Sequence, residues 1–148
     1  MSENIDAYLA GDLLYGDSFS DAEIAQWFAD EASAYTDMTG DDAIDEFGYT
    51  QWAVRHGYAR LPPAQRFRHV VGFGSGRGNE LEPIDHRIDR ITIVESSDRY
   101  AEPGDRLTAP VDFVSAQPSG ELALADRSAD LVVCLGVLHH IPNVSHVV

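Results

Sequence analysis

The chain has 148 residues, of which 44% are hydrophobic and 24% charged, a composition typical of one soluble globular domain. Its 25 acidic and 10 basic side chains give a formal net charge of −15, so a nucleic-acid partner, which needs clustered Lys and Arg, is not expected. No apolar run reaches the roughly 18 residues of a membrane-spanning helix, and no basic segment at the N-terminus indicates a secretory signal. The single cysteine, Cys134, fits a reducing compartment, so we expect a cytoplasmic protein.

Charge is distributed unevenly along the chain. Residues 1–50 hold 13 Asp and Glu and no Lys, Arg or His, which gives −13, whereas residues 51–148 hold 12 acids and 10 bases, which gives −2. All the bases are arginine, and the absence of lysine excludes catalysis through a lysine Schiff base. The acidic third is interpreted either as a solvated acidic face or as a flap that attracts a cationic substrate or partner.

A capping box predicts the first helix. Ser20 stands at the N-cap position, and Glu23 follows three residues later. The helix is expected over residues 20 to about 35, because apolar residues recur behind the box at helical spacing. These apolar residues are Ile24, Trp27, Phe28, Ala32 and Tyr35.

A second helix is expected from about Asp42 to His56, with Gly57 as its C-cap. Residues 61–63, Leu-Pro-Pro, then end helical structure and indicate a short linker. Because the texture of the sequence changes at this point, residues 1–65 are predicted to form an acidic helical cap.

The remainder of the chain alternates short apolar strands with helices or loops. Strands are expected at residues 69–73, 90–94, 111–114 and 131–135, and a short helix at residues 79–84. The last strand, Leu-Val-Val-Cys-Leu, is apolar throughout, which predicts burial on both faces. Strands that alternate with helices and loops favour the α/β fold class with a parallel sheet.

A glycine-rich turn, Gly-Ser-Gly-Arg-Gly at residues 74–78, follows the first strand. Glycines there let the backbone approach a ligand closely, and α/β sheets bind ligands at the carboxyl ends of their strands. The turn fails the dinucleotide fingerprint G-x-G-x-x-G in every register, since the third small position falls on Arg77, Asn79 or Leu81. Glu95, at the end of the second strand, is placed to accept hydrogen bonds from ribose hydroxyls.

The strongest motif lies near the end of the chain. Residues 130–143, Asp-Leu-Val-Val-Cys-Leu-Gly-Val-Leu-His-His-Ile-Pro-Asn, resemble the fourth-strand motif of class I S-adenosylmethionine-dependent methyltransferases. The turn at residues 74–78 resembles the glycine-rich motif of that family, and Glu95 its acidic motif. The resemblance implies a Rossmann-like parallel sheet of which about four strands are present. Residues 66–148 are therefore expected to be the N-terminal part of the cofactor-binding domain.

The resemblance also implies which residues hold S-adenosylmethionine. The glycine turn would lie against the amino-acid half of the cofactor, while Glu95 would bind the ribose. Ser96 and Gln117 would lie near the adenine, and the backbone after the fourth strand would pack against the methionine portion. The implied cofactor-binding residues are Gly74, Ser75, Gly76, Gly78, Glu95, Ser96, Gln117, Leu135 and Gly136.

The sequence departs from the family pattern at two places. Gly72 stands where the family usually has an acid at the end of the first strand. Ala116 and Gln117 stand where an acid usually binds the adenine amine, although the Gln117 amide could still contact adenine. Both departures predict a weaker affinity for the cofactor.

His139 and His140 are the candidate catalytic bases, because a neutral imidazole just past the fourth strand can take a proton from a methyl acceptor at pH 7. The alternative is structural, with one histidine packed beneath the cofactor loop and the other capping the next helix. No metal site is predicted, since these histidines lack an established ligand spacing.

The resemblance implies methyl transfer from S-adenosylmethionine to a small-molecule acceptor. Two alternatives stay open. The first is a half-domain or partner module that binds the cofactor without turnover, and the second is a nicotinamide-dependent oxidoreductase, which the failed fingerprint disfavours. With only four strands the fourth would form an open sheet edge, so self-association of the chain is also expected.

Overall fold

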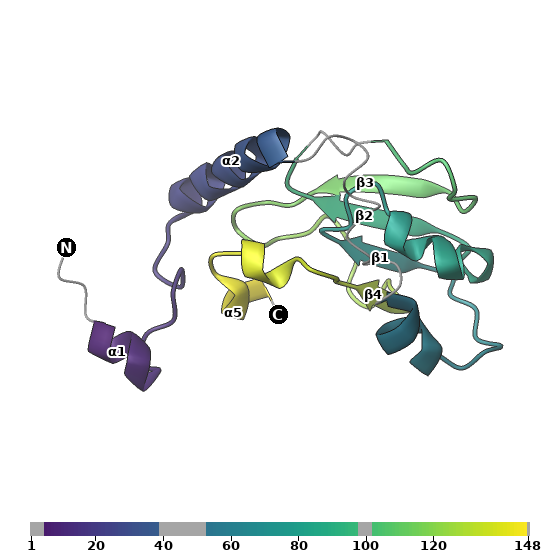
Figure 1. Cartoon of the computed structure of the whole chain (residues 1–148), viewed down its shortest axis with the longest axis horizontal. Coiled ribbons are helices and arrows are strands. Elements are labelled where there is room, and N and C mark those ends of the chain that lie inside the picture. The colour runs from purple at the N-terminus through teal and green to yellow at the C-terminus, as the bar shows by residue number, and fades with distance from the viewer. Residues whose placement is uncertain (1–4, 39–52, 98–101, 148) are drawn as a thin grey trace.

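The computed structural model describes residues 5–38, 53–97 and 102–147. At its centre is a four-stranded, all-parallel sheet with the strands in the order β3-β2-β1-β4 (Figure 1). The predicted α/β class and Rossmann-like arrangement are confirmed, and each strand begins within one residue of its predicted start. The strands are β1 (Val70–Phe73), β2 (Ile91–Glu95), β3 (Val111–Ser115) and β4 (Leu131–Val133).

Helices lie before, between and after these strands. None in the described part of the chain is long and apolar enough to cross a membrane. In Figure 1, α2 and α5 lie beyond the carboxyl ends of the strands. The α-helices are α1 (Ile5–Ala10), α2 (Asp21–Met38) and α5 (Val144–Val147); η1 (Ala53–Gly57) is a π-helix; and η2 (Tyr58–Arg60), η3 (Asn79–Arg87) and η5 (Leu138–His140) are 3-10 helices.

The capping box that predicted α2 is present. The Ser20 N–H donates to Glu23 Oε2 at 2.8 Å, and the Glu23 N–H donates to Ser20 Oγ at 3.4 Å. The two residues thus satisfy each other's free backbone donors, which is why the helix begins at Asp21. The first predicted helix is confirmed.

The second predicted helix falls largely on residues 39–52, which lie outside the described residues. At its end, η1 passes directly into η2, and Gly57 has φ −106° and ψ −76°. This is a right-handed conformation, so the prediction of Gly57 as a C-cap is wrong. Helical structure stops instead at Leu61, which is extended because the residue before a proline avoids the helical region.

One face of the sheet carries the main core. In the register Val70↔Ile91 and Gly72↔Val133, alternate side chains of β1, β2 and β4 point to the same side. The helix η3, predicted as residues 79–84, runs on to Arg87 and covers this face with Leu81 and Ile84. The fully buried side chains of the cluster include Phe67, Val70, Leu81, Ile91 and Ile93.

The opposite face of β4 is open. Val132, which points to that side, is 61% exposed, while Val133 on the core side is 6% exposed. The prediction that the fourth strand is buried on both faces is therefore wrong for the described chain. The strand also ends at Val133, two residues earlier than predicted. Apolar composition drives burial only where another element is available to cover the strand.

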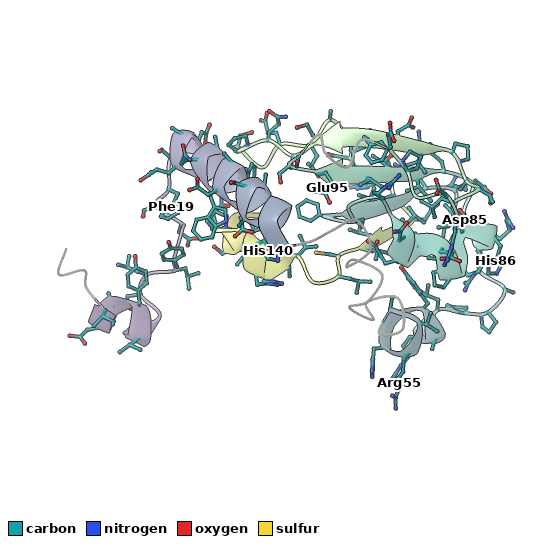
Figure 2. The ribbon with its side chains drawn as sticks, turned by 45° about the horizontal axis from the view of Figure 1, so that its top comes forward. Phe19, Arg55, Asp85, His86, Glu95 and His140 are labelled. Carbon is teal, nitrogen blue, oxygen red and sulfur yellow. The ribbon has the colours of Figure 1, made fainter. Side chains whose placement is uncertain are left out.

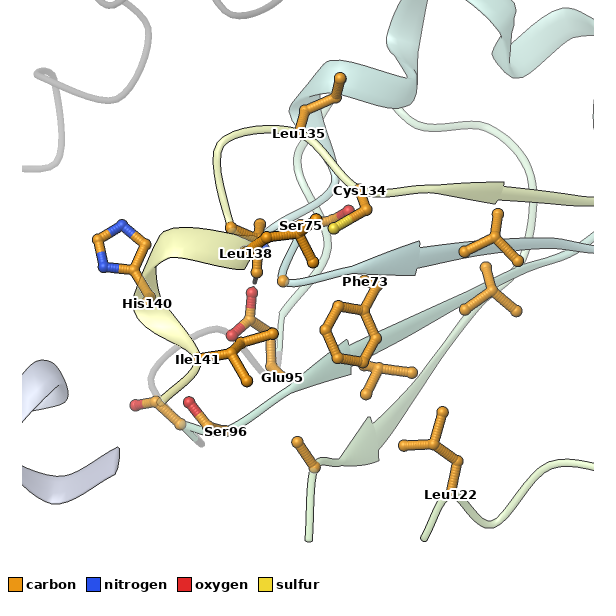
Figure 3. Close-up of a pocket in the computed structure, with 18 of the residues that line it drawn as sticks. Phe73, Ser75, Glu95, Ser96, Leu122, Cys134, Leu135, Leu138, His140 and Ile141 are labelled. Atoms are coloured by element: carbon orange, nitrogen blue, oxygen red, sulfur yellow. Dashed lines mark hydrogen bonds between the residues drawn. The ribbon is translucent and has the colours of Figure 1, made fainter. Parts of the chain in front are cut away.

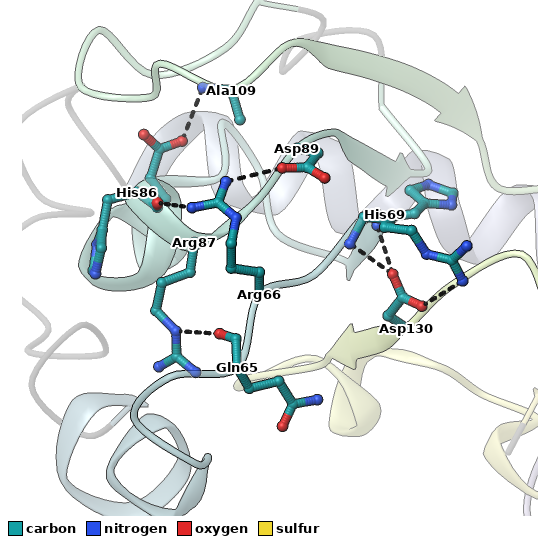
Figure 4. Close-up of polar contacts among 10 residues, drawn as sticks. Gln65, Arg66, His69, His86, Arg87, Asp89, Ala109 and Asp130 are labelled. Atoms are coloured by element: carbon teal, nitrogen blue, oxygen red, sulfur yellow. Dashed lines mark hydrogen bonds and ion pairs between the residues drawn. The ribbon is translucent and has the colours of Figure 1, made fainter.

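Polar contacts close the amino end of the sheet (Figure 4). Asp130, just before β4, accepts hydrogen bonds on Oδ2 from the N–H groups of Arg68 at 2.7 Å and His69 at 3.0 Å. Asp85, near the end of η3, accepts from the N–H groups of Thr108 and Ala109, each at 3.0 Å. Asp130 thus links the segments that enter β1 and β4, and Asp85 links η3 to the segment that enters β3.

Candidate active site

The glycine-rich turn lies between β1 and η3, at the carboxyl end of the sheet. Gly74 has φ +64°, and a Cβ atom on it would overlap the side chain of Val137, so the turn lies directly against the segment after β4. Gly78 is buried, and its Cβ would lie 2.9 Å from Cδ1 of Ile93 and 3.0 Å from Leu107. The first glycine therefore brings two motifs together, and the last allows η3 to pack on the sheet.

Glu95 closes over this turn from the end of β2 (Figure 3). Its Oε1 accepts a hydrogen bond from the N–H of Gly76 at 2.5 Å. Burial raises the pKa of Glu95, although the N–H groups of Gly76 and Ser96 oppose the shift. A carboxylate has about four acceptor positions. Glu95 thus holds the loop while keeping capacity for the hydroxyl groups of a ligand.

Ser75 fills the space beside Gly72. A Cβ atom on Gly72 would lie 2.5 Å from Ser75 Oγ and 2.9 Å from Ser75 Cβ, so the serine occupies the space that a side chain at position 72 would need. The Ser75 hydroxyl is itself buried without a hydrogen-bond partner. A buried hydroxyl of this kind is costly, and a polar ligand atom would remove that cost.

A cavity of about 1380 Å³ opens at the carboxyl ends of the strands. Ser96, directly after β2, and Gln117, two residues after β3, line this cavity. The exposed Gln117 side chain donates to the Ser115 carbonyl at 3.3 Å. Gly78 and His139 are not among the residues that line it. The predicted site residues that do line it are Gly74, Ser75, Gly76, Glu95, Ser96, Gln117, Leu135, Gly136 and His140.

Glu80 is a cavity residue that the sequence interpretation missed. It is the second residue of η3, and burial raises the pKa of its carboxyl to about 7, with the charge of Glu95 adding to the shift. The Ser75 hydroxyl lies near enough to lower that pKa in part, but not in the geometry of a hydrogen bond. Cys134 lines the same cavity, and burial raises the pKa of its thiol, which argues against a nucleophilic role.

His140 meets α2 across the mouth of the cavity. Its Nδ1 lies 3.0 Å from Oε2 of Glu31, and the two side chains are 29% and 31% exposed. The indole N–H of Trp27 donates to the His140 carbonyl at 2.9 Å, so two residues one turn apart on α2 bind the same histidine. Figure 2 shows His140 beneath this helix, at the same end of the sheet as Glu95.

Glu31 was also missed, although a signal existed. It stands four residues after Trp27, inside the apolar stripe of α2, and a charged residue in such a stripe indicates a polar partner. Contacts near Gly16 reinforce the same junction, because a Cβ there would overlap the Pro142 carbonyl, and Ser145 Oγ donates to Asp17. The segment before and within α2 is thus fastened to the segment after β4.

The site fits the cofactor that the sequence motifs imply. A cavity this size, a buried acid at the end of β2 and an unpartnered hydroxyl in the glycine turn suit a ligand with ribose hydroxyls and a polar amino-acid end. Within the described ranges, no group of three or more His, Cys, Asp or Glu is arranged to hold a metal ion.

Comparisons with known proteins agree with this geometry. A family model described as "Methyltransferase domain" matches residues 71–148, which are 78 of the 148 residues. A chain from the complex between the Haloferax volcanii Trm112 methyltransferase activator and a methyltransferase has the same fold, with a TM-score of 0.52 and 21% identity. That match covers 88% of this chain and 54% of the solved one, so the chain spans about half of its length. The comparison with curated proteins gives no match.

The family match covers more than half of the chain and includes the three motifs that form the cavity: the glycine turn, Glu95 and the segment after β4. The match to the solved structure, at 21% identity, supports the fold. The chain belongs to the methyltransferase domain family, a family of S-adenosylmethionine-dependent enzymes.

Proposed function

We propose that this chain binds S-adenosylmethionine in the cavity at the carboxyl end of the sheet and takes part in methyl transfer to a small-molecule acceptor. The observation that carries the proposal is the contact between Glu95 and the N–H of Gly76. It joins the acid expected at the ribose to the turn expected at the amino-acid half. Ser96 and Gln117 extend the same wall toward the adenine, while Leu135 and Gly136 border the methionine portion.

The bound cofactor would supply an electrophilic methyl group, which an acceptor oxygen or nitrogen attacks in line with the departing sulfur. The chain then has to align the acceptor, exclude water and remove one proton. We assign the proton to His140. In the tautomer in which Nδ1–H of His140 donates to Glu31, Nε2 is the ring nitrogen that takes the proton. His139, outside the cavity lining, has no such role in this scheme.

The helix α2 would act as a cover for the acceptor. Ile24, Phe28, Glu31 and Ala32 all line the cavity from this helix. Its apolar side chains would exclude water from the transfer, and its acidic outer surface would favour a cationic or neutral acceptor over an anionic one. The cavity volume of about 1380 Å³, part of which the cofactor would occupy, supports an acceptor of small-molecule size.

Calorimetric titration with S-adenosylhomocysteine tests the cofactor assignment, with NAD as the control ligand. We expect binding of the first ligand alone, and a loss of at least tenfold in affinity for Glu95→Gln, because one or more hydrogen bonds to a charged group are lost. A folded chain that binds neither ligand would contradict the proposal. It would leave the alternative of a degenerate half-domain.

Measurements of turnover test the assignment of His140 as the base. Release of S-adenosylhomocysteine from S-adenosylmethionine is measured over a panel of hydroxylated and amino small molecules. His140→Asn should lower the rate by about 100-fold or more, while the neighbouring His139→Asn should change it far less. If both variants have equal rates with an acceptor that turns over, His140 is not the base. If no acceptor is methylated by a chain that binds the cofactor, the half-domain interpretation is favoured.

A further inference from the structure

We propose that Glu80 binds the α-ammonium group of the cofactor's amino-acid half, in place of the acid that position 72 lacks. This inference rests on the proposed function, since it names a further contact in the same cavity. Glu80 lines that cavity together with the glycine turn, Cys134 and Leu135, which are the residues expected around the amino-acid half.

Position 72 cannot supply the acid. The space beside the Gly72 Cα is filled by the Ser75 side chain, whose Oγ would lie 2.5 Å from a Cβ there. An aspartate or glutamate at this position would have to displace the serine from a buried site. Position 72 is a glycine in this chain, so any carboxylate for the ammonium must come from another element.

The backbone of Glu80, in η3, is held by a contact from η2. The Tyr58 hydroxyl of η2 donates to the Glu80 carbonyl at 2.9 Å, which anchors the first turn of η3. The polar and titratable groups that act on or near its carboxyl come from four parts of the fold. They are Glu95 of β2, Tyr58 of η2, Cys134 after β4 and Ser75 of the glycine turn, and none of them is a cation.

The carboxylate also has no counter-ion from the described chain. The ion pairs there join Arg66 to Asp89, Arg68 to Asp130, Arg106 to Glu82 and His140 to Glu31, so none includes Glu80. The sequence contains no lysine that could supply one. Two carboxyls, Glu80 and Glu95, thus lie in one cavity with no ion pair to either among the described residues, although Arg77, Arg106 and Arg127 line the same cavity elsewhere. A cationic ligand group would balance them.

S-adenosylmethionine carries two cations, the α-ammonium and the sulfonium. The ammonium has three N–H donors, whereas the sulfonium has none. The Ser75 hydroxyl beside Glu80, which has no hydrogen-bond partner among the described residues, can accept a hydrogen bond from an N–H donor, and a sulfonium offers it no such donor. The pair of a carboxylate and a free hydroxyl acceptor therefore points to the ammonium.

Two ligands and two variants test the assignment. S-adenosylhomocysteine has the ammonium and no sulfonium, and 5′-methylthioadenosine has neither. We expect Glu80→Gln to weaken S-adenosylhomocysteine binding at least tenfold and to leave 5′-methylthioadenosine within twofold. The matched control, Glu121→Gln, removes the same charge from an exposed side chain that does not line the cavity. It should leave both affinities within twofold.

Other outcomes separate the two proposals. If Glu80→Gln changes neither ligand, or both equally, the Glu80 assignment is wrong while the cofactor site stands. If it weakens S-adenosylmethionine much more than S-adenosylhomocysteine, Glu80 faces the sulfonium instead, which also overturns the assignment. If the unaltered chain binds no nucleoside ligand at all, the proposed function itself has failed.

A measurement on the unaltered chain covers the case in which Glu80→Gln does not fold. An ammonium beside Glu80 favours the ionised carboxyl, whose pKa in the free chain is about 7. Binding of S-adenosylhomocysteine at pH 6.5 should therefore release roughly half a proton or more, seen by calorimetry in buffers of different ionisation enthalpy. Binding of 5′-methylthioadenosine should release almost none. Equal proton release by the two ligands would refute the inference.

Discussion

Carboxyl groups at the two ends of the parallel sheet have pKa values shifted in opposite directions. At the amino end, N–H groups of His69 and Arg68 donate to Asp130 and hold its pKa below the ordinary value. At the carboxyl end, burial raises the pKa of both Glu80 and Glu95. Figure 2 places Asp85 and His86 at the first end and Glu95 and His140 at the other.

The difference shows which polar groups stabilise the fold and which stay available to a ligand. The amino-end carboxylates have their acceptor positions filled by backbone N–H groups, so they stabilise the native state and offer little to a ligand. Among the described residues, the carboxyl end keeps a buried hydroxyl without a hydrogen-bond partner, at Ser75, and an acid without an ion pair, at Glu80. Unmet polar groups around a cavity are the mark of a binding site.

The largest effect is expected from Asp85→Ala at the amino end. The change leaves the N–H groups of Thr108 and Ala109 without an acceptor, and hydrogen bonds to a charged group are worth about 1.5–3 kcal/mol each. We expect a loss of about 4 kcal/mol in the free energy of unfolding, measured in urea. Asp89→Ala is the control, since its ion pair with Arg66 is exposed and should cost under about 1 kcal/mol. If both variants lose the same free energy of unfolding, the contacts of Asp85 stabilise the fold no more than an exposed ion pair does.

At pH 8, Glu80→Gln at the carboxyl end should raise the free energy of unfolding, whereas Asp85→Ala should lower it. The folded pKa of about 7 exceeds the ordinary value of 4.5, so stability from this group is present below pH 4.5 and is lost as the pH rises through 7. At pH 8 the variant should therefore be more stable by up to about 3 kcal/mol. The gain should shrink toward pH 5 in a series of unfolding curves. A variant that is less stable at pH 8 would show that the carboxylate is satisfied in the free chain.

Gly74→Ala tests the junction between the glycine turn and the segment after β4. The residue has φ +64°, which costs an alanine about 1–2 kcal/mol, and its Cβ would also displace Val137. Gly120→Ala is the matched control, with φ +78° and no atom within 4 Å of the added carbon. We expect the Gly74 variant to lose about 1 kcal/mol more than the control, and to lose affinity for S-adenosylhomocysteine. Equal losses would mean that Val137 moves aside freely.

The smallest change in stability is expected at the open edge. Val132→Lys replaces a side chain that is 61% exposed, so the free energy of unfolding should change by less than about 0.5 kcal/mol. A lysine on an edge strand opposes pairing with a second sheet. If the chain self-associates through β4, light scattering should show a lower mass for Val132→Lys. Val144→Lys, off the sheet on α5, should leave the mass unchanged.

Local pattern was enough to predict much of the fold and part of the site. The four strands and the helix behind the Ser20–Glu23 box were predicted from short-range patterns, and the parallel arrangement from the alternation of strands with helices and loops. Glu95 and the glycine turn could be placed at one edge because parallel strands all end on the same side of a sheet. The boundary at residue 65 and the self-association stay predictions.

The failures share a physical reason. Apolar composition predicted that the fourth strand is buried on both faces, yet Val132 is exposed because burial depends on which elements pack nearby. The sequence shows that position 72 has no acid, but it does not show that the Ser75 side chain fills the space beside Gly72. Neither result is encoded in the residues adjacent to the position concerned.

The sequence by itself determined the strands, the glycine turn, the acid at the end of β2 and the family to which they point, since these depend on short-range order along the chain. Only the tertiary structure decided that Glu31 holds His140, across 109 residues, and that Glu80 lies beside Ser75 with no ion pair in the described part of the chain. The pKa of a carboxyl depends on the solvent and charges around it, and these are set by the packing of distant elements.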